Sequence, residues 1–163
     1  MERLLADVLR ILREEIDLYR GLADHARQKT ALLVRGQVDA IMESNKTDET
    51  FSIKLRILED EMSRLCRELC QVFTIPYEEF TLLRLADAVS QSVAAEIRAQ
   101  TSLFKNLIAE LKSINHRNTM LIESSVRYSR GLLDFLQSAA GSYQQNGMFR
   151  PMTSMQTTMS RRA

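Results

Sequence analysis

Thiol and imidazole groups are the first candidates for chemistry in this sequence, and they belong to Cys66, Cys70, His25 and His116. Cys66 and Cys70 lie four residues apart on a predicted helix. Their side chains share a face, but a full helical turn separates their Cβ atoms by more than an unstrained disulfide can span. We interpret them as reduced thiols at the edge of a core. The two histidines stand alone, without the Glu-x-x-His or Cys-x-x-Cys spacing of metal sites, so we expect surface histidines, no metal and no cofactor.

Catalytic constellations are not found either. The sequence has no Gly-rich phosphate loop, no nucleophile with an ordered base and no pair of carboxylates flanked by turn residues. Its 22 basic and 21 acidic residues give a formal charge of +1, which attracts neither nucleic acid nor an anionic membrane. No uncharged run approaches the length of about 18 residues that spans a bilayer. The first residues, MERLLADVLRILREE, carry acids and lack a cleavage site of small residues, which argues against a secretory or transit peptide. We therefore predict a cytoplasmic protein that is not an enzyme.

Long helices are what the composition favours. The chain has 45% apolar residues but only five glycines and two prolines among 163 residues, so turn formers are few. Apolar residues recur at alternating steps of four and three over three long stretches, which is the spacing of helices that pack in a coiled coil. The predicted helices are residues 2–35, 38–74, 82–89 and 92–140.

The breaks between these helices have recognisable signals. Gly36 is a candidate C-cap, because glycine adopts the left-handed conformation at little cost. Pro76 ends the second helix, and Thr81 is a candidate N-cap for the short one. We predict an all-α fold, an elongated antiparallel bundle or coiled coil of three long helices plus one short helix. Residues 1–141 form the bundle and residues 142–163 a flexible C-terminal tail.

Polar residues interrupt the apolar seams at a few positions. Thr30 is the polar member of the first seam, and Asn118 is one of three in the last. A single Asn in a seam costs stability but fixes the register, because it is satisfied only opposite a matching polar group. Asn118 has this role or is a polar residue tolerated near a solvated end. Residues 44–49 also interrupt the second seam; either the helices diverge there or, as we favour, the stretch is loosely packed and solvated, because no helix breaker interrupts it.

The apolar face of the last long helix is wider than one neighbour requires. At 100° per residue its apolar side chains cover about 180°, whereas a seam against one neighbour occupies about 100°. Either both other long helices pack on this face, or it accepts an amphipathic helix from another protein. The face consists of Leu121, Ile122, Val126, Tyr128, Leu132, Leu133, Phe135 and Leu136.

The C-terminal tail has a methionine pattern. Met148, Met152, Met155 and Met159 follow one another at steps of four, three and four. Methionine is flexible and polarisable, so such a stripe suits a surface that adapts to more than one apolar partner. The alternative is a disordered tail in which the spacing is coincidental.

Taken in order, these segments resemble the FlgN family, the cytosolic export chaperones of the bacterial flagellum. In that family a long first helix ends in a Gly-containing turn, as in LLVRGQVDAIMES, and a second helix carries spaced leucines and charges, as in KLRILEDEMSRLCREL. The last long helix bears an Asn-x-x-Asn-x-x-Leu-Leu signature, which corresponds to NHRNTMLI here. The matching residues are Asn115, Asn118, Leu121 and Ile122, the last in place of a leucine. The likeness runs over about residues 3–150 and leaves the methionine-rich tail unmatched.

The resemblance implies a carrier. Proteins of this family bind the C-terminal helices of the hook-associated proteins at the hook–filament junction, prevent their premature polymerisation and deliver them to the flagellar type III export apparatus. The client-binding residues that it implies are Asn118, Leu121, Ile122, Val126, Leu132, Leu133 and Leu136. It also implies docking on the export gate through Tyr143 and Gly147, although Tyr143 can instead pack on its own helix end. The alternative class is a structural coiled-coil scaffold that homo-oligomerises through the same apolar face and has no client.

Overall fold

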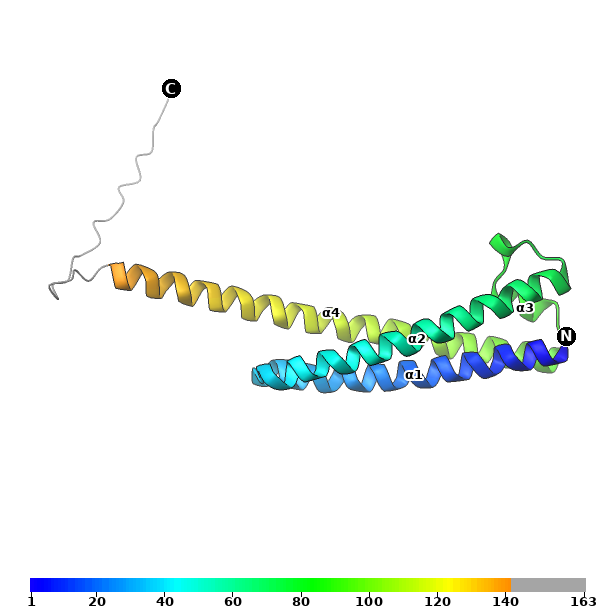
Figure 1. Cartoon of the computed structure of the whole chain (residues 1–163), viewed down its shortest axis with the longest axis horizontal. Helices are drawn as coiled ribbons and strands as arrows, with labels where there is room; N and C mark the ends of the chain where they lie inside the picture. Colours follow the sequence, from blue (N-terminus) through cyan, green and yellow to red (C-terminus); the bar gives the residue numbers. More distant parts are fainter. Residues whose placement is uncertain (142–163) are drawn as a thin grey trace, which may run out of the picture. The chain divides into compact units, whose positions relative to one another are not determined.

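A computed structural model describes residues 1–141 of the chain, and the predicted tail, residues 142–163, lies outside the described residues. The predicted all-α fold is confirmed, since the described residues form three long helices and a short one and contain no strand (Figure 1). The elements are α1 (Glu2–Arg35), α2 (Val38–Phe73), the 3₁₀ turn η1 (Tyr77–Glu79), α3 (Leu82–Asp87) and α4 (Gln91–Gly141). Contacts separate two compact units, Met1–Leu121 and a second one that begins at Ile122, and the division between them falls within α4. The predicted division into a bundle and a tail stays a prediction.

The end of α1 has the glycine cap that the sequence predicts. Gly36 takes φ 65° and ψ 30°, a left-handed conformation that costs glycine little. The N–H groups of Gly36 and Gln37 donate to the carbonyl oxygens of Leu33 and Leu32 at 3.2 and 3.1 Å, which satisfies two of the last carbonyls of the helix. The short turn makes α1 and α2 antiparallel neighbours.

The connection from α2 to α4 is built from local caps. Thr74 closes α2 in the left-handed conformation (φ 53°), and the N–H of Ile75 donates to the carbonyl oxygen of Cys70 at 3.0 Å. Thr81 is the N-cap of α3, as predicted, because its hydroxyl accepts the N–H of Arg84 at 3.1 Å. These caps direct α3 back onto the bundle, where its residues Leu85 and Ala86 are buried.

The first unit is a three-helix bundle in which α4 runs parallel to α1. Residue pairs that join the two helices advance together along both chains: Arg13 with Glu96, Tyr19 with Phe104 and Arg27 with Glu110. The rings of Tyr19 and Phe104 meet edge to face, with centroids 4.9 Å apart and planes at 89°. Since α1 and α2 are antiparallel, α4 is antiparallel to α2 within this unit.

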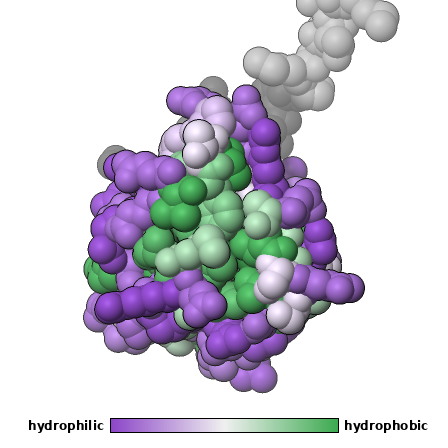
Figure 2. Space-filling view, turned by 90° about the vertical axis from the view of Figure 1, so that its right-hand side faces the viewer, coloured by the Kyte–Doolittle hydropathy of each residue, from purple (hydrophilic) through white to green (hydrophobic). Residues whose placement is uncertain are grey.

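One apolar cluster joins all four helices near the N-terminus. Its buried members are Leu5, Val8, Leu9 and Ile11 from α1, Leu65 and Leu69 from α2, Leu85 and Ala86 from α3, and Ala94 and Ile97 from α4. At this end of the bundle, a hollow of about 390 Å³ opens among apolar side chains that include Met1, Phe73 and Val93, and apolar surface gathers in the middle of the end face (Figure 2). Among the described helices, no segment is long and apolar enough to cross a membrane.

Candidate functional site

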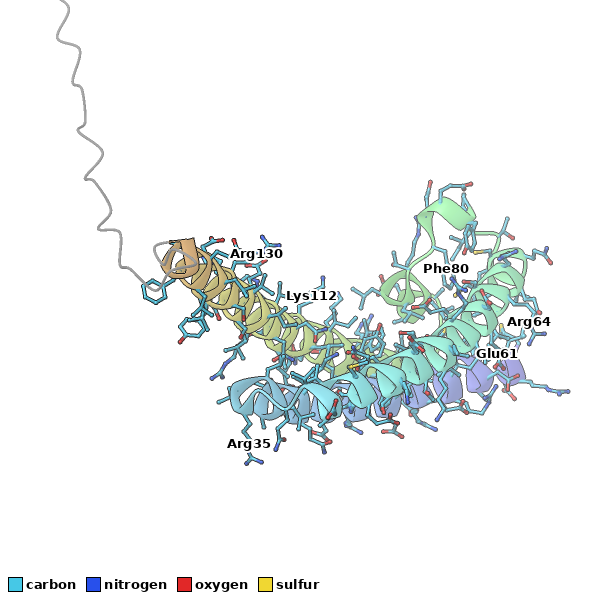
Figure 3. All side chains as sticks on the ribbon, turned by 60° about the vertical axis from the view of Figure 1, so that its left-hand side comes forward. Arg35, Glu61, Arg64, Phe80, Lys112 and Arg130 are labelled. Carbon is cyan, nitrogen blue, oxygen red and sulfur yellow. The ribbon has the colours of Figure 1, made fainter. Side chains whose placement is uncertain are left out.

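The second half of α4 presents the apolar face that the sequence singles out. Every described side chain from Ile122 to Ser138 is exposed. The predicted client-binding residues of this segment are Ile122, Val126, Leu132, Leu133 and Leu136, and they are 44%, 43%, 47%, 57% and 53% exposed. Tyr128 and Phe135, from the same face, are 75% and 67% exposed. Arg130 marks the polar side of this segment in Figure 3. Large apolar side chains with this exposure are uncommon as a contiguous set on a helix and are typical of an interaction surface.

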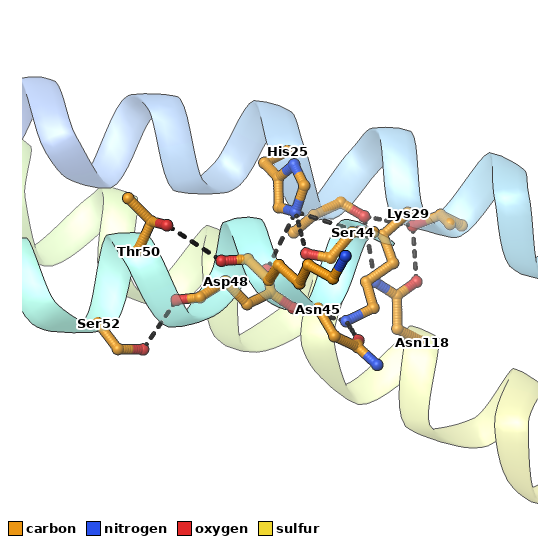
Figure 4. A network of polar contacts seen from close by, with 11 residues as sticks. His25, Lys29, Ser44, Asn45, Asp48, Thr50, Ser52 and Asn118 are labelled. Carbon is orange, nitrogen blue, oxygen red and sulfur yellow. Dashed lines mark hydrogen bonds and ion pairs between the residues drawn. The ribbon is translucent and has the colours of Figure 1, made fainter. Parts of the chain in front are cut away.

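Asn118, one of the predicted client-binding residues, does not belong to that exposed set. Its side chain is 5% exposed and lies against α1. Its amide nitrogen donates to the carbonyl oxygen of Ala26 at 3.1 Å, and its amide oxygen accepts the hydroxyl of Thr30 at 2.6 Å (Figure 4). Because both polar atoms of the amide have partners inside the bundle, Asn118 has no surface to offer a client. Leu121 is half-buried.

The matching polar group that the register hypothesis predicts lies opposite Asn118, since Thr30 is the polar member of the facing seam. The hydroxyl of Thr30 also lies 3.0 Å from the carbonyl oxygen of Ala26, so its single proton is placed between two acceptors. A slip of one helical turn between α1 and α4 would leave the amide of Asn118 against apolar side chains. The pair therefore specifies one alignment of the two helices.

A second polar group lies between α1 and α2, where the sequence predicts a loosely packed stretch. That expectation is wrong for two residues, since Ser44 is buried and Asp48 is bonded on both sides (Figure 4). The remaining residues, Asn45, Lys46, Thr47 and Glu49, are exposed as expected. One carboxylate oxygen of Asp48 lies 3.1 Å from Nε2 of His25, and the other lies 2.5 Å from Nζ of Lys29. The expectation of a surface histidine is also wrong for His25, whose side chain is only 13% exposed, whereas His116 is exposed.

Three oxygen atoms surround one ring nitrogen of His25. Nε2 lies 3.1 Å from the carbonyl oxygen of Ser44, 3.1 Å from the hydroxyl oxygen of Ser44 and 3.1 Å from a carboxylate oxygen of Asp48. Because the carbonyl and carboxylate oxygens only accept, this arrangement favours a donor at Nε2. The Lys29 ammonium, whose side chain is 16% exposed, also donates to Oδ1 of Asn45 at 2.6 Å. These ion-paired and hydrogen-bonded side chains form a polar layer that holds α2 on α1.

The sequence contains a signal for this layer, although apolar spacing alone does not reveal it. A second stripe with the same steps of four and three runs along α1 one residue ahead of the first. Its members are Leu4, Val8, Ile11, Glu15, Leu18, Leu22, His25, Lys29 and Leu32. The stripe faces α2. Its three polar members interrupt the apolar pattern, so apolar spacing alone does not reveal it.

Glu15 is the third polar member, and its neighbour across the helix contact is an acid. It is 6% exposed and faces Glu59 of α2. Burial, together with the charge of Glu59, raises the pKa of Glu15 from its ordinary value of 4.5 to about 7. A carboxyl group in this position is half-protonated near neutral pH.

The two thiols lie in surroundings that make them unreactive. Cys66 is half-buried and Cys70 is buried, and they are not bonded to each other. Burial raises the pKa of Cys66 to about 11, with the neighbouring Cys70 and Glu15 as further causes. A protonated thiol is a poor nucleophile and a poor metal ligand. Within the described part of the chain, no group of three or more His, Cys, Asp or Glu side chains is placed to hold a metal ion.

A further apolar surface lies between α1 and α2. A groove of about 500 Å³ has Leu18, Phe51 and Leu58 in its lining, and Ile57 at its side is 60% exposed. Its rim carries charges of both signs, and each acid there has a basic neighbour on its own helix: Glu14 with Arg10 and Asp17 with Arg20. The two residues predicted for export-gate docking, Tyr143 and Gly147, lie outside the described residues.

An exposed apolar face on the last helix of a helical bundle is a feature of binding proteins. The profile of the family described as FlgN protein matches residues 1–150. The chain belongs to the FlgN family. A search of curated proteins and a search of solved structures gave no match. Membership gives the chain the general role of a flagellar export chaperone that binds flagellar proteins, in a family of chaperones rather than of enzymes.

Proposed function

We propose that this chaperone acts in the cytosol, binds the C-terminal helices of hook-associated proteins, prevents their premature polymerisation and delivers them to the type III export apparatus. Family membership supports the chaperone role. The observation that carries the client surface is the exposure of five large aliphatic side chains on one face of α4. The proposed client-binding residues are Ile122, Val126, Leu132, Leu133 and Leu136.

The physical argument concerns what the client exposes. A protein that polymerises by packing terminal helices carries an uncovered apolar stripe while it is a monomer, and such a stripe promotes aggregation. An apolar face on a second helix shields it by helix-to-helix packing. Ordering the client segment costs several kcal/mol of the interaction energy, so we expect moderate affinity, which suits a carrier that releases its cargo.

The client surface is tested with the double variant Val126→Asp/Leu133→Asp. Each substitution puts a carboxylate into the proposed interface, so we expect the affinity for a full-length hook-associated protein to fall at least about tenfold. Helix content in circular dichroism should stay unchanged, because both side chains are exposed. The control is Arg130→Asp on the polar side, which changes the net charge by the same amount and should leave binding intact.

Two outcomes would overturn the proposal. Normal client binding by the double variant would show that the client does not bind to this face. The scaffold alternative predicts that the chain alone forms an oligomer, that the double variant disperses it, and that a hook-associated protein is never bound. Size-exclusion chromatography with light scattering distinguishes these cases.

We propose that delivery involves Tyr143 and Gly147. They belong to SYQQNG (residues 142–147), which resembles the segment of the family in which a Tyr, followed shortly by a Gly, comes after the last long helix. Truncation after Gly141 should leave client binding unchanged and reduce secretion of the client into the medium. Tyr143→Ala should do the same, with Gln144→Ala as the neighbouring control. Undiminished secretion by the truncated chain would contradict this role.

A further inference from the structure

The apolar face of α4 changes width within the helix. The positions of α4 are described by a seven-residue repeat that starts at Ile97. The central positions are residues 97, 104, 111, 118, 125 and 132, and the residues three and four places after each of them lie beside them on the same face. The residue directly after each central position lies at the border of this face, and we call these residues the edge positions. In the first unit the edge positions are Arg98, Lys105, Lys112 and Thr119, all exposed and polar; Lys112 is labelled in Figure 3. In the second unit they are Val126 and Leu133, which are apolar and 43% and 57% exposed.

The first unit shows how much of the helix two neighbours cover. Its central residues and those three and four places later span about 100° at 3.6 residues per turn. This arc contacts α1, through Phe104 on Tyr19 and Asn118 on Ala26. It also contacts α2, since Ala94 and Ile97 share one buried cluster with Leu65 and Leu69. The flanking Glu96 and Glu110 also pair with Arg13 and Arg27 of α1, so two neighbouring helices cover an arc of about 140° on α4.

The second unit presents a larger arc. Adding the edge positions extends the exposed face to about 160° at the same 100° per residue, with Ser125 and Ser129 as polar members near its centre. One margin of this face is formed by Tyr128 and Phe135, and the other by Val126 and Leu133. A single helix placed on the centre of this face would leave one or both margins in water. Since two helices cover the narrower arc of the first unit, the wider arc needs at least two.

We propose that the partner of this face supplies two helices rather than one, the first packed along Tyr128 and Phe135 and the second along Val126 and Leu133. The inference rests on the proposed function, because it describes the partner of the same face. The spacing supports it: the steps of four and three that bury Leu111 and Asn118 continue through Leu132, with the polar Ser125 between them. Because the proposed function assigns this face to a client, the occupant is a pair of amphipathic helices from one client molecule.

The test uses photo-crosslinking in the full chain. Phe135 and Leu133 are replaced, one at a time, by p-benzoylphenylalanine, and each variant is mixed with a full-length hook-associated protein from the same organism. Crosslinked peptides are identified by mass spectrometry. We expect the two margins to crosslink to two different segments of the client. The same probe at Arg130, on the polar side, should give little crosslinking.

The outcomes separate this inference from the function on which it rests. Crosslinks from both margins to one and the same client helix would overturn the two-helix inference and leave the proposed function standing. Crosslinks to a second copy of this chain would overturn it in favour of self-association. If no complex forms before irradiation, the proposed function fails and the inference fails with it.

A substitution at one margin supplies the second measurement. The double variant Val126→Lys/Leu133→Lys gives the second unit polar edge positions like those of the first unit. It should weaken binding by about tenfold, and it should leave the crosslink from Phe135 in place, since the helix on that margin still docks. The control Glu123→Lys adds positive charge on the polar side and should bind normally. Loss of the Phe135 crosslink in the margin variant, with its fold intact, would show that one helix covers both margins.

Discussion

Thr30 on α1 donates its hydroxyl hydrogen bond to Asn118 on α4 across 88 residues of sequence, at 2.6 Å. Each is the polar residue of an otherwise apolar stretch of its seam, and neither is exposed. A buried amide costs little when it is paired and much when it is not. The pair therefore stabilises one alignment of α1 and α4 mainly by making the others unfavourable.

Asn118→Ala removes both hydrogen bonds of the amide. We expect the free energy of unfolding to fall by about 1–2 kcal/mol, measured by urea denaturation followed by circular dichroism. Thr30→Val/Asn118→Leu, which replaces both partners by apolar groups of similar size, should recover most of this loss. The control is the exposed neighbour Asn115→Ala, with an effect within about 0.5 kcal/mol. A double variant as unstable as Asn118→Ala would contradict this account.

Asp48→Asn removes the carboxylate that joins His25 and Lys29. The Lys29 ammonium is held in a half-buried position by this group, so its loss should lower the free energy of unfolding by about 1–3 kcal/mol. Glu43→Gln breaks a pair with Lys46 in which both side chains are more than 70% exposed, and should change stability by less than about 0.5 kcal/mol. Equal effects of the two substitutions would show that the layer contributes no more than a surface ion pair.

Glu15 should make stability depend on pH. Its pKa is raised to about 7 in the folded chain, so the folded state binds the proton more tightly than the unfolded state does. Its contribution is therefore fully present below the ordinary value of 4.5, falls as the pH rises from there to about 7, and is level above that. Glu15→Gln is neutral at every pH and should be more stable than the parent by about 1–2 kcal/mol at alkaline pH and nearly equal to it in acid.

The matched control for this titration is Glu14→Gln, because Glu14 is the exposed neighbour of Glu15 at the rim of the groove between α1 and α2 and pairs with Arg10. Loss of this exposed pair should change the free energy of unfolding little, because exposed ion pairs contribute little. Denaturation curves at several pH values measure both differences. A pH-independent gain for Glu15→Gln would place the effect in packing rather than in ionisation.

Two glycines should respond in opposite directions to alanine. Gly131 lies inside α4, and no atom outside its own turn lies within 4 Å of the place that a Cβ would take, so Gly131→Ala should strengthen the helix by about 0.5–1 kcal/mol. Gly36 has φ +65°, where a Cβ is strained, so Gly36→Ala should destabilise the bundle by about 1 kcal/mol. Amide hydrogen exchange along α4 measures the first effect, and thermal unfolding the second. Slower exchange confined to residues far from Gly131 would argue against the first.

The helices and one of the two interfaces of α1 follow from the sequence. The steps of four and three locate the seam that contacts α4, because nearly all of its members are apolar. The stripe that contacts α2 has the same spacing but was missed, since Glu15, His25 and Lys29 break the apolar pattern. Whether such residues are buried depends on partners such as Asp48 in another helix, and a single helix pattern carries no information about them.

The candidate site was only partly predictable for a related reason. The width of the apolar face on α4 is a property of its sequence, but whether neighbouring helices cover the face is a property of the fold. Asn118 and Val126 look equally suited to a client by position along the helix. The structure buries the first and exposes the second. Their difference comes from Ala26 and Thr30 of α1, which offer Asn118 its partners.

The uninterrupted course of α4 from Gln91 to Gly141 affects how a visiting chain would be received. Forming the first turn is the unfavourable step of helix formation, and an isolated helix shorter than about 15 residues is only marginally stable in water. Here that step is completed in residues 91–121, whose side chains are anchored by tertiary packing, and the remaining turns only add to it. An incoming client segment therefore binds to a segment that is already helical, and only the client loses conformational entropy by becoming ordered.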